Sequence, residues 1–439
     1  MNSICRTTGA AGSRNGTRGA RAQGSRMMMA CAALAAAVAC DAALGQSIRA
    51  VGRIPGSTYS IGGYGTSADG GVATGYADSP QGSRAFRWSL EDGVTNLGTL
   101  PGGRFSFGNV VSGNGQFIVG TSDSSEGIRA YRWSVTQGMQ SLGVLSGGTY
   151  SFAQSVNRDG NVVIGFGSMP EGERAFRWTA GGGMQSLGTL PGGVNSGAYG
   201  MNEDGRFVVG YSNVAGDVVH AFRWDEAGGM IDLGLPTGAQ SSLAYGVNND
   251  GTAVVGGAEL PGGTMRAFRW TAESGMQDLG ALPVRTDALA VAVSSDGRTV
   301  VGTTRFQSAT TAFVWTPESG MRDLNEFLGE HGVNLEGWYL FEGRGVSPNG
   351  RVFSGTGVYY GEILAFVALL DDSCSSCPAD FNCDQTITSQ DFYDFLTAFL
   401  NSEAQSDFNR DGSLDTRDLF DFLNVMFTGC SAGGGGGGG

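Results

Sequence analysis

Residues 174–193 are RAFRWTAGGGMQSLGTLPGG, and similar stretches recur through the middle of the chain. Their shared core is Ala-Phe-Arg-Trp or a near match, and its copies end at Trp88, Trp133, Trp178, Trp224, Trp270 and Trp315. Successive copies lie 45 or 46 residues apart. A constant period of this length is typical of proteins in which each repeat forms one supersecondary unit that packs against the next.

A second marker, Asp-Gly or Asn-Gly, divides each repeat. It begins at Asp69, Asn114, Asp159, Asp204, Asp250, Asp296 and Asn349. In the unit around Asp159, apolar alternation predicts four short strands, at residues 151–157, 161–165, 174–178 and 184–190. We expect Asp-Gly to supply the positive φ angles of a tight hairpin between the first two strands. Four strands in each unit of this period predict a β-propeller blade.

Alternation along the strand explains the aromatic motif. Phe176 and Trp178 point to one face of the strand, and Ala175 and Arg177 point to the other. Because blades stack face to face, a bulky face must meet a small one on the neighbouring blade. Burying each Phe or Trp then contributes about 2 kcal/mol or more.

The two ends of the repeat region are complementary. Residues 48–56, before the first Asp-Gly, match the fourth-strand pattern of residues 185–192, and the last unit, 343–370, has three strands and then stops. The N-terminal strand can therefore complete the last blade and remove the open sheet edges. We predict an all-β, seven-bladed propeller over residues 46–370; an open β-solenoid is the alternative.

The repeat resembles the HAF family of bacterial extracellular repeats, which is named for His-Ala-Phe. His220-Ala221-Phe222 matches the name, and Arg holds the His position in other units, at Arg84, Arg129, Arg174 and Arg266. The resemblance covers residues 48–370. It implies an extracellular, β-rich protein and brings no catalytic residues with it.

The N-terminus predicts export. Five arginines precede an apolar stretch, 27–40, which is too short to span a bilayer. Ala43-Leu44-Gly45 is a candidate cleavage site, so residues 1–45 are predicted to be a signal peptide. A lipoprotein signal at Cys40 is the alternative. Either reading places the protein outside the cell or on its surface.

Acidic residues concentrate near the C-terminus. The net charge is −14, and residues 371–439 hold twelve Asp and Glu against Arg410 and Arg417. The chain contains no lysine. Such a distribution lacks the basic surface that nucleic-acid binding requires.

Two oxygen-rich loops, 380–391 and 407–418, lie 27 residues apart in this acidic region. The candidate ligands of the first loop are Asp380, Asn382, Asp384, Thr386, Thr388 and Asp391. Those of the second loop are Asp407, Asn409, Asp411, Ser413, Asp415 and Asp418. Each loop runs into an apolar helical pattern, and the spacing suits a cation that takes about six to eight oxygens. We predict two bound Ca²⁺ ions; Asx-rich turns without metal are the alternative.

Asp at the twelfth loop position and a single helix after each loop resemble a dockerin, over residues 377–430. The resemblance implies a docking module that binds a cohesin domain or a similar cell-surface protein. The family's recognition pair maps to Ser389-Gln390 and to Thr416-Arg417. Because the two pairs differ, a symmetric dual binding mode is not expected. Residues 371–376 then form a linker, and residues 431–439 form a flexible Gly tail.

Four cysteines remain after cleavage, and all lie in the C-terminal region: Cys374, Cys377, Cys383 and Cys430. An even, clustered set in an exported chain predicts disulfides, with three possible connectivities. The dockerin resemblance implies that the ends of the module lie close together. It therefore favours Cys377–Cys430 and leaves Cys374–Cys383.

The sequence offers little for catalysis. His220 occupies a repeat position, His331 has no obvious partner, and no Gly-x-Ser-x-Gly motif occurs. An enzyme would need carboxylates alone, and the irregular stretch before the last unit carries Glu326, Glu330, Glu336 and Glu342. We expect a non-catalytic binding or structural propeller that docks through the calcium module. The alternative is a polysaccharide-active enzyme or lectin-like propeller on the same tether, with Trp338 and Tyr339 as candidate sugar-contacting residues.

The two calcium sites should be unequal, with the second tighter. Loop two offers four carboxylates and loop one offers three, because Thr388 replaces an acid, and ligand charge controls affinity. Gly412 adopts the sharp turn freely, whereas a positive φ at Gln385 costs on the order of 1 kcal/mol, about fivefold in affinity. Calorimetric titration of the full chain should show two events, and Asp407→Ala should remove the tighter one. Loss of only the weaker event would contradict this ranking.

Overall fold

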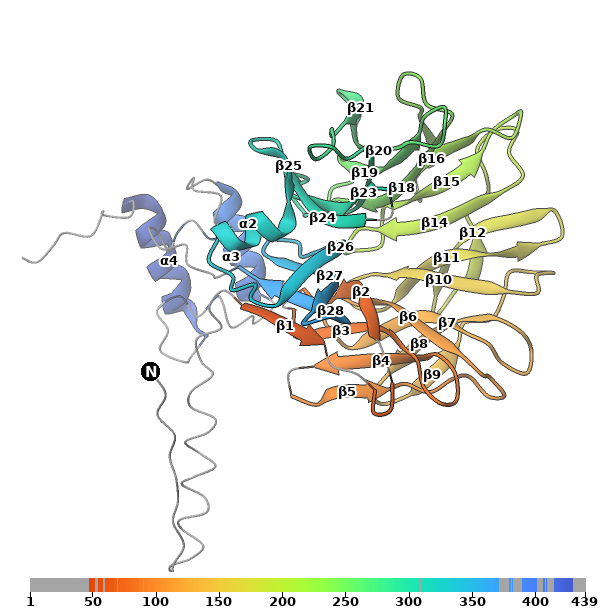
Figure 1. Ribbon diagram of the computed structural model, residues 1–439, viewed down its shortest axis with the longest axis horizontal. Helices are drawn as coiled ribbons and strands as arrows, with labels where there is room; N and C mark the ends of the chain where they lie inside the picture. Colours follow the sequence, from red (N-terminus) through yellow and green to blue (C-terminus); the bar gives the residue numbers. More distant parts are fainter. Residues whose placement is uncertain are drawn as a thin grey trace, which may run out of the picture. The chain divides into compact units, whose positions relative to one another are not determined.

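The computed structural model describes residues 47–51, 54–57, 60–68, 70–89, 91–307, 309–370, 389–400 and 414–428, together with Ala379, Phe381, Ser406 and Phe408. These residues form seven four-stranded sheets and three helices. Each sheet is one blade of a β-propeller, and in six blades the strands are consecutive from the innermost to the outermost. In Figure 1 the sequence colours run in order around the ring of blades.

The first three blades follow the chain in order. Blade one consists of β2 (Ser60–Thr66), β3 (Val72–Ala77), β4 (Arg84–Ser89) and β5 (Gly93–Asn96). Blade two consists of β6 (Ser106–Val111), β7 (Phe117–Ser122), β8 (Arg129–Ser134) and β9 (Gly138–Ser141). Blade three consists of β10 (Ser151–Val156), β11 (Val162–Met169), β12 (Gly172–Thr179) and β13 (Gly183–Ser186).

The next three blades repeat this order. Blade four consists of β14 (Ser196–Met201), β15 (Val208–Asn213), β16 (Val219–Asp225) and β17 (Gly229–Gly234). Blade five consists of β18 (Ser241–Val247), β19 (Val254–Glu259), β20 (Met265–Thr271) and β21 (Gly275–Asp278). Blade six consists of β22 (Asp287–Val293), β23 (Val300–Phe306), β24 (Ala309–Thr316) and β25 (Gly320–Asp323).

Blade seven joins the two ends of the repeat region. Its strands are β26 (Trp338–Val346), β27 (Val352–Tyr359), β28 (Glu362–Leu369) and, at the outer edge, β1 (Ser47–Val51). Figure 1 shows β1 beside β28. The two strands pair antiparallel, with Ile48 opposite Ala368 and Ala50 opposite Phe366. The predicted closure by the N-terminal strand is confirmed, and with it the seven-bladed propeller; the open solenoid is excluded.

The turn between the first two strands differs from the predicted hairpin. Only the glycine of the Asp-Gly pair has a positive φ, 77° at Gly160. The Asn157 side chain closes the turn, because its Oδ1 accepts a hydrogen bond of 2.9 Å from the Val162 N–H. This wider turn lets Asp159 keep an ordinary backbone conformation. The prediction of positive φ at both residues was therefore wrong.

The fourth strand is also shorter than predicted. It ends at Ser186, whereas the apolar pattern extended to Leu190. Gly188 has a φ of 79°, which ends the extended conformation. Leu190, which follows the end of the strand, is fully buried in the interface with blade four.

Aromatic side chains pack on alanines at every blade interface. Ala175 of blade three lies in one buried cluster with Phe222 and Trp224 of blade four. The ring closes in the same way, because Ala365 of blade seven shares a cluster with Phe86 of blade one. The predicted pairing of bulky and small faces is confirmed, and one such apolar cluster occupies each interface between consecutive blades of the described propeller.

The arginine of the Ala-Phe-Arg-Trp motif ties neighbouring blades together. Arg132 donates a hydrogen bond of 2.7 Å to the carbonyl of Gly160, in the Asp-Gly turn of the next blade. Arg223 makes the equivalent bond to the Gly251 carbonyl, also at 2.7 Å. The Arg132 guanidinium also lies 4.6 Å from the centre of the Phe117 ring. The motif therefore fixes both the spacing of the blades and the position of the turns.

The irregular stretch before blade seven contains a short helix, α2 (Leu324–Glu330). Asp323 caps its N-terminus by accepting a hydrogen bond of 2.8 Å from the Asn325 N–H. Leu324 and Leu328 are fully buried against blades six and seven. The insertion thus covers part of the core between these blades.

The C-terminal part contains α3 (Ser389–Leu400) and α4 (Thr416–Thr428). Phe395 and Phe422 are fully buried and stack with their ring centres 4.1 Å apart. The two phenylalanines are 27 residues apart, the same spacing as the two loops, so they are equivalent residues of the two halves. Their contact indicates an approximate two-fold relation between the halves. Leu400 and Phe427, the last apolar residues of the two helices, are 73% and 79% exposed. No helix among the described residues is long and apolar enough to cross a membrane.

Enlarging an interface alanine should weaken the propeller. Ala175→Leu adds bulk where Phe222 and Trp224 already fill the space, so we expect a loss of about 1–3 kcal/mol in unfolding free energy. Ala180→Leu, at an exposed position after the same strand, should change it by less than about 0.5 kcal/mol. Chemical denaturation of the full chain measures both. Equal effects would contradict the tight pairing of aromatic and alanine faces.

Candidate central ligand site

Six of the seven innermost strands contain a β-bulge at the same place in the repeat. In each, one residue lies between two register positions and has no partner on the second strand. These residues are Asn109, Gln154, Tyr199, Tyr245, Val291 and Arg344. In β2 of blade one the register is irregular over residues 62–66. Bulges re-aim side chains, and they are frequent beside functional sites.

All six bulge residues line one central cavity. Its volume is about 590 Å³, and residues from the innermost strands of all seven blades surround it. This volume lies in the range of about 300–1,000 Å³ that is typical of small-ligand sites. The frame of the propeller therefore presents one variable side chain from each of six blades to a common space.

Two aromatic residues, both tyrosines, line the cavity. Tyr199 and Tyr245 are stacked, with ring centres 5.1 Å apart and planes 13° from parallel. Burial, and then the neighbouring Tyr245 and Glu173, raise the pKa of Tyr199. Burial raises the pKa of Tyr245 as well. Both hydroxyls therefore stay protonated well above neutral pH and remain available as hydrogen-bond donors and acceptors.

Small residues beside the bulges bring the inner strands close together. A Cβ at Gly200 would lie 2.1 Å from the Tyr245 carbonyl oxygen, and one at Gly246 would lie 3.0 Å from the Val291 carbonyl oxygen. Only glycine fits at residue 200, and a small residue is favoured at 246, where neighbouring inner strands converge. This close approach is what places Tyr199 and Tyr245 within stacking distance.

One mouth of the cavity is braced by the Asp-Gly turns. The Ala68 N–H donates to the Gly113 carbonyl at 3.0 Å, and the Arg158 N–H donates to the Glu203 carbonyl at 2.7 Å. The Pro348 carbonyl accepts a similar bond from the Ser295 N–H at 2.8 Å. Proline has no backbone N–H, so Pro348 cannot donate the corresponding bond to the next turn. Hydrogen bonds between neighbouring turns therefore hold this mouth at a fixed width.

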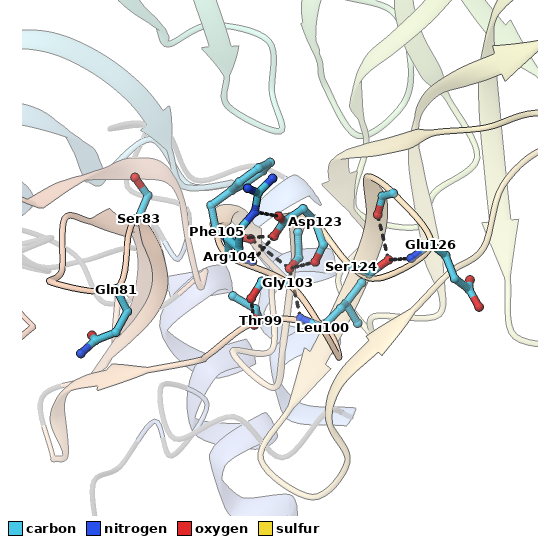
Figure 2. A network of polar contacts seen from close by, with 12 residues as sticks. Gln81, Ser83, Thr99, Leu100, Gly103, Arg104, Phe105, Asp123, Ser124 and Glu126 are labelled. Atoms are coloured by element: carbon cyan, nitrogen blue, oxygen red, sulfur yellow. Dashed lines mark hydrogen bonds and ion pairs between the residues drawn. The ribbon is translucent and has the colours of Figure 1, made fainter.

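At the opposite mouth of the cavity, a polar side chain at the end of the second strand holds the loop that leads into the innermost strand of the same blade. Figure 2 shows Asp123, whose Oδ1 accepts hydrogen bonds of 2.5 Å and 2.8 Å from the N–H groups of Arg104 and Phe105. Burial opposes ionisation of this carboxyl, but these two N–H groups hold its pKa below the usual value. In blade four, Asn213 accepts the equivalent pair of bonds. The loops at this mouth are thus held in place by their own blades.

Most of the predicted calcium ligands lie outside the described residues: Asp380, Asn382, Asp384, Thr386, Thr388, Asp407, Asn409, Asp411 and Ser413. Asp391 and Asp418 are fully buried in the first turns of α3 and α4. The Asp415 N–H donates to Asp418 at 2.9 Å, and the Asp415 carboxylate accepts from the Arg417 N–H at 2.7 Å. These two aspartates therefore also cap α4. Among the described residues no group of three or more His, Cys, Asp or Glu is placed to hold a metal ion.

The remaining predicted docking and disulfide residues are placed only in part. Thr416 and Arg417 are exposed at the start of α4. Ser389 and Gln390 begin α3, and their side chains are outside the described part. Cys374, Cys377, Cys383 and Cys430 are also outside it. The calcium sites, the recognition pairs and the disulfides therefore stay predictions.

The residues considered for catalysis do not line the central cavity. In blade seven, Glu342 contacts one residue that does, Arg344. His220 lies 2.9 Å from Asp232, as Arg266 does from Asp278 in the next blade. His331 stacks on Phe327. Of the four glutamates, Glu330 pairs with Arg322 at 2.6 Å and Glu342 with Arg344 at 2.9 Å; Glu326 and Glu336 lie in and after α2. These carboxylates do not form one cluster.

The two aromatic candidates contact residues of their own blade and of blade six. Trp338 packs against Tyr359 and Phe366, with ring centres 4.8 Å and 6.3 Å away. The Tyr339 hydroxyl bonds to Thr311 and to the Thr310 carbonyl of blade six. Neither lines the central cavity. They are therefore no part of the central cavity, and a sugar site at these two residues stays a prediction.

No protein family and no curated protein matches this chain. Similar solved structures include an oligogalacturonate lyase in complex with manganese, at 14% identity and a TM-score of 0.49, covering 75% of this chain and 98% of that one. Another is the β-propeller domain of the Trilobed protease from Pyrococcus furiosus, at 9% identity and a TM-score of 0.48, covering 71% and 94%. TolB from Acinetobacter baumannii has 14% identity and a TM-score of 0.41 and covers 58% and 63%. These similarities carry no conclusion about activity.

Sequence reasoning missed the bulge residues, although a signal exists. At this position the repeats carry five residue types in six blades, between neighbours that are mostly Gly or Ala. Variation inside a strand that is otherwise repeated shows that packing does not dictate the residue. Only the register of the strands reveals that these side chains meet in one cavity.

Removing the charge of Glu173 should lower two tyrosine pKa values. Its carboxylate accepts hydrogen bonds from Tyr211 at 2.6 Å and Tyr150 at 3.2 Å. Burial raises the pKa of both tyrosines, and the Glu173 charge and hydrogen bonds raise them further. Ultraviolet titration of Glu173→Gln should show both phenols ionising at lower pH than in the native chain. Glu171→Gln, at an exposed position in the turn just before β12, should not change the titration; an equal change would contradict the assignment.

Proposed function

We propose that this protein is an extracellular, non-catalytic binding propeller whose central cavity takes a neutral glycan. The observation that carries the proposal is the set of unused polar groups in the cavity. Tyr199, Tyr245 and Gln154 line it, and no hydrogen bond joins their hydroxyls and side-chain amide to other described residues. Asn109 uses only its Nδ2, which donates to the Ala153 carbonyl at 2.6 Å, so its Oδ1 is also available.

The chemistry of these groups suits a sugar. Tyrosine hydroxyls and side-chain amides both donate and accept hydrogen bonds, and sugar hydroxyls do the same. The C–H faces of a sugar ring pack on aromatic faces, whose π electrons carry partial negative charge. A cavity with one aromatic wall and a few converging polar groups offers both contacts together.

The charges favour a neutral ligand over an acidic one. Arg344, the cation of the bulge positions, bonds to Glu342 at 2.9 Å. At the turn-braced mouth, Arg158 lies 4.0 Å from Glu203, which also accepts a hydrogen bond from Asn249. The chain as a whole carries a net charge of −14. A polyanionic ligand would meet repulsion from this field.

The C-terminal helical pair is proposed to dock the propeller to a protein partner in a calcium-dependent way. Besides the loop pattern, one feature of the helices supports this role. Tyr393 and Leu400 of α3 are 59% and 73% exposed, and their counterparts Phe420 and Phe427 of α4 are 67% and 79% exposed. Each pair lies seven residues apart, on one side of its helix. Large exposed apolar side chains at such a spacing are typical of protein-binding helices.

Glycan binding by the full chain tests the main proposal. Tyr199→Ala and Tyr245→Ala should each weaken binding on a glycan array by roughly tenfold, because each removes one face of the stacked pair. Tyr393→Ala, an exposed tyrosine on α3, should leave glycan binding unchanged. Absence of binding to every neutral glycan would contradict the proposal. Cleavage of a bound glycan would favour the enzyme alternative.

A further inference from the structure

A continuous series of aromatic rings leads from the surface loops of blade three into the cavity. Tyr150 contacts Phe152 with ring centres 5.6 Å apart, and Phe152 stacks on Phe166 at 5.1 Å. Phe166 lies 6.3 Å from Tyr199, which stacks on Tyr245 at 5.1 Å. All five rings are half-buried, so each keeps part of its surface accessible. We call these five residues the aromatic track.

The track lies at the mouth opposite to the Asp-Gly turns, where the innermost strands begin. Inner-strand and second-strand residues that face each other there are Phe152–Phe166 in blade three and Gly197–Tyr211 in blade four. The equivalent pairs are Ile61–Tyr76 in blade one, Phe107–Thr121 in blade two, Leu243–Gly257 in blade five, Leu289–Thr303 in blade six and Glu342–Thr356 in blade seven. Aromatic side chains at this level therefore lie in blades one to four. Those of blades three and four join Tyr199 and Tyr245 through ring contacts, whereas Tyr76 and Phe107 form a separate pair.

The outer end of the track is fixed by polar contacts. Glu173 bridges Tyr150 and Tyr211, and its own N–H donates to Asn195 at 3.0 Å. The Tyr150 N–H also bonds to Ser168 at 3.2 Å. Because these bonds hold the rings before any ligand arrives, binding would require little ordering of side chains.

We propose that the ligand is an extended linear chain of neutral sugars, with one end in the central cavity and the following units on the aromatic track. This inference rests on the proposed function and adds the length and the direction of the ligand. A series of partly exposed aromatic rings gives each successive sugar an apolar contact, whereas a single sugar would use only Tyr199 and Tyr245. The carboxylate of Glu173 and the amide of Asn195 at the rim accept and donate hydrogen bonds to sugar hydroxyls.

A proline-rich peptide is the other ligand that aromatic grooves accept. Such a peptide presents mainly carbonyl acceptors to a groove. The cavity and the rim offer acceptors as well as donors, at the Asn109 Oδ1 and the Glu173 carboxylate. These acceptors match hydroxyls and find no partner on a proline-rich backbone. The structure therefore favours the glycan.

The test is the length dependence of binding by the full chain. Cello-, manno- and xylo-oligosaccharide ladders, from disaccharide to octasaccharide, are titrated by calorimetry. For at least one ladder we expect affinity to rise tenfold or more with length and then to level off. Tyr150→Ala and Phe152→Ala should abolish this rise and leave disaccharide affinity within twofold of the native value. Tyr245→Ala should weaken every length alike.

The other outcomes are distinct. Binding that does not depend on length would overturn the track and leave the central glycan site standing. Failure of all three ladders, or tighter binding of a proline-rich peptide, would overturn both. Phe152→Tyr, which keeps the ring, should retain the length dependence; if it behaves like Phe152→Ala, the effect is structural and the track is wrong.

Discussion

The contact between an aromatic side chain and an alanine on the neighbouring blade is the constraint on which the rest of the structure depends. Where Phe222 and Trp224 lie on Ala175, two sheets meet with the bulk entirely on one side. The same asymmetric contact at every interface turns a linear repeat into a ring. Its last instance, between Ala365 and Phe86, needs β1 to complete blade seven. The central cavity follows, because seven inner strands then converge on one axis.

The bulges separate recognition from folding. The strands around the cavity obey the demands of the ring, with Gly200 and Gly246 placed where backbones approach closely. The bulge residue has no register partner on the second strand, and its side chain lines the cavity. Gln154 and Tyr199 can therefore differ within the same blade frame. Repeat proteins commonly combine a constant frame with variable surface positions in this way.

The sequence predicts the blades and their number well, because period, turns and strand alternation all depend on local residue patterns. The complementary ends even predict that β1 pairs with β28. Local patterns could not show that the Asn157 side chain closes the turn, or that Gly188 ends the fourth strand before Leu190. The site depends on the pairing register between the first and second strands of each blade, which a single sequence does not reveal. The irregular stretch before blade seven suggested Trp338 and Tyr339 as sugar contacts, whereas the residues of the central site lie inside the repeated inner strands.

The most direct test of the central site is the crystal structure of the full chain with a neutral oligosaccharide that it binds. We predict a sugar ring packed against Tyr199 and Tyr245, with its hydroxyls bonded to Gln154 and to the Asn109 Oδ1. We also predict no change in the blade interfaces, because the cavity already exists without ligand. A sugar bound on the outer strands or between two blades, with the central cavity holding only water, would contradict the assignment.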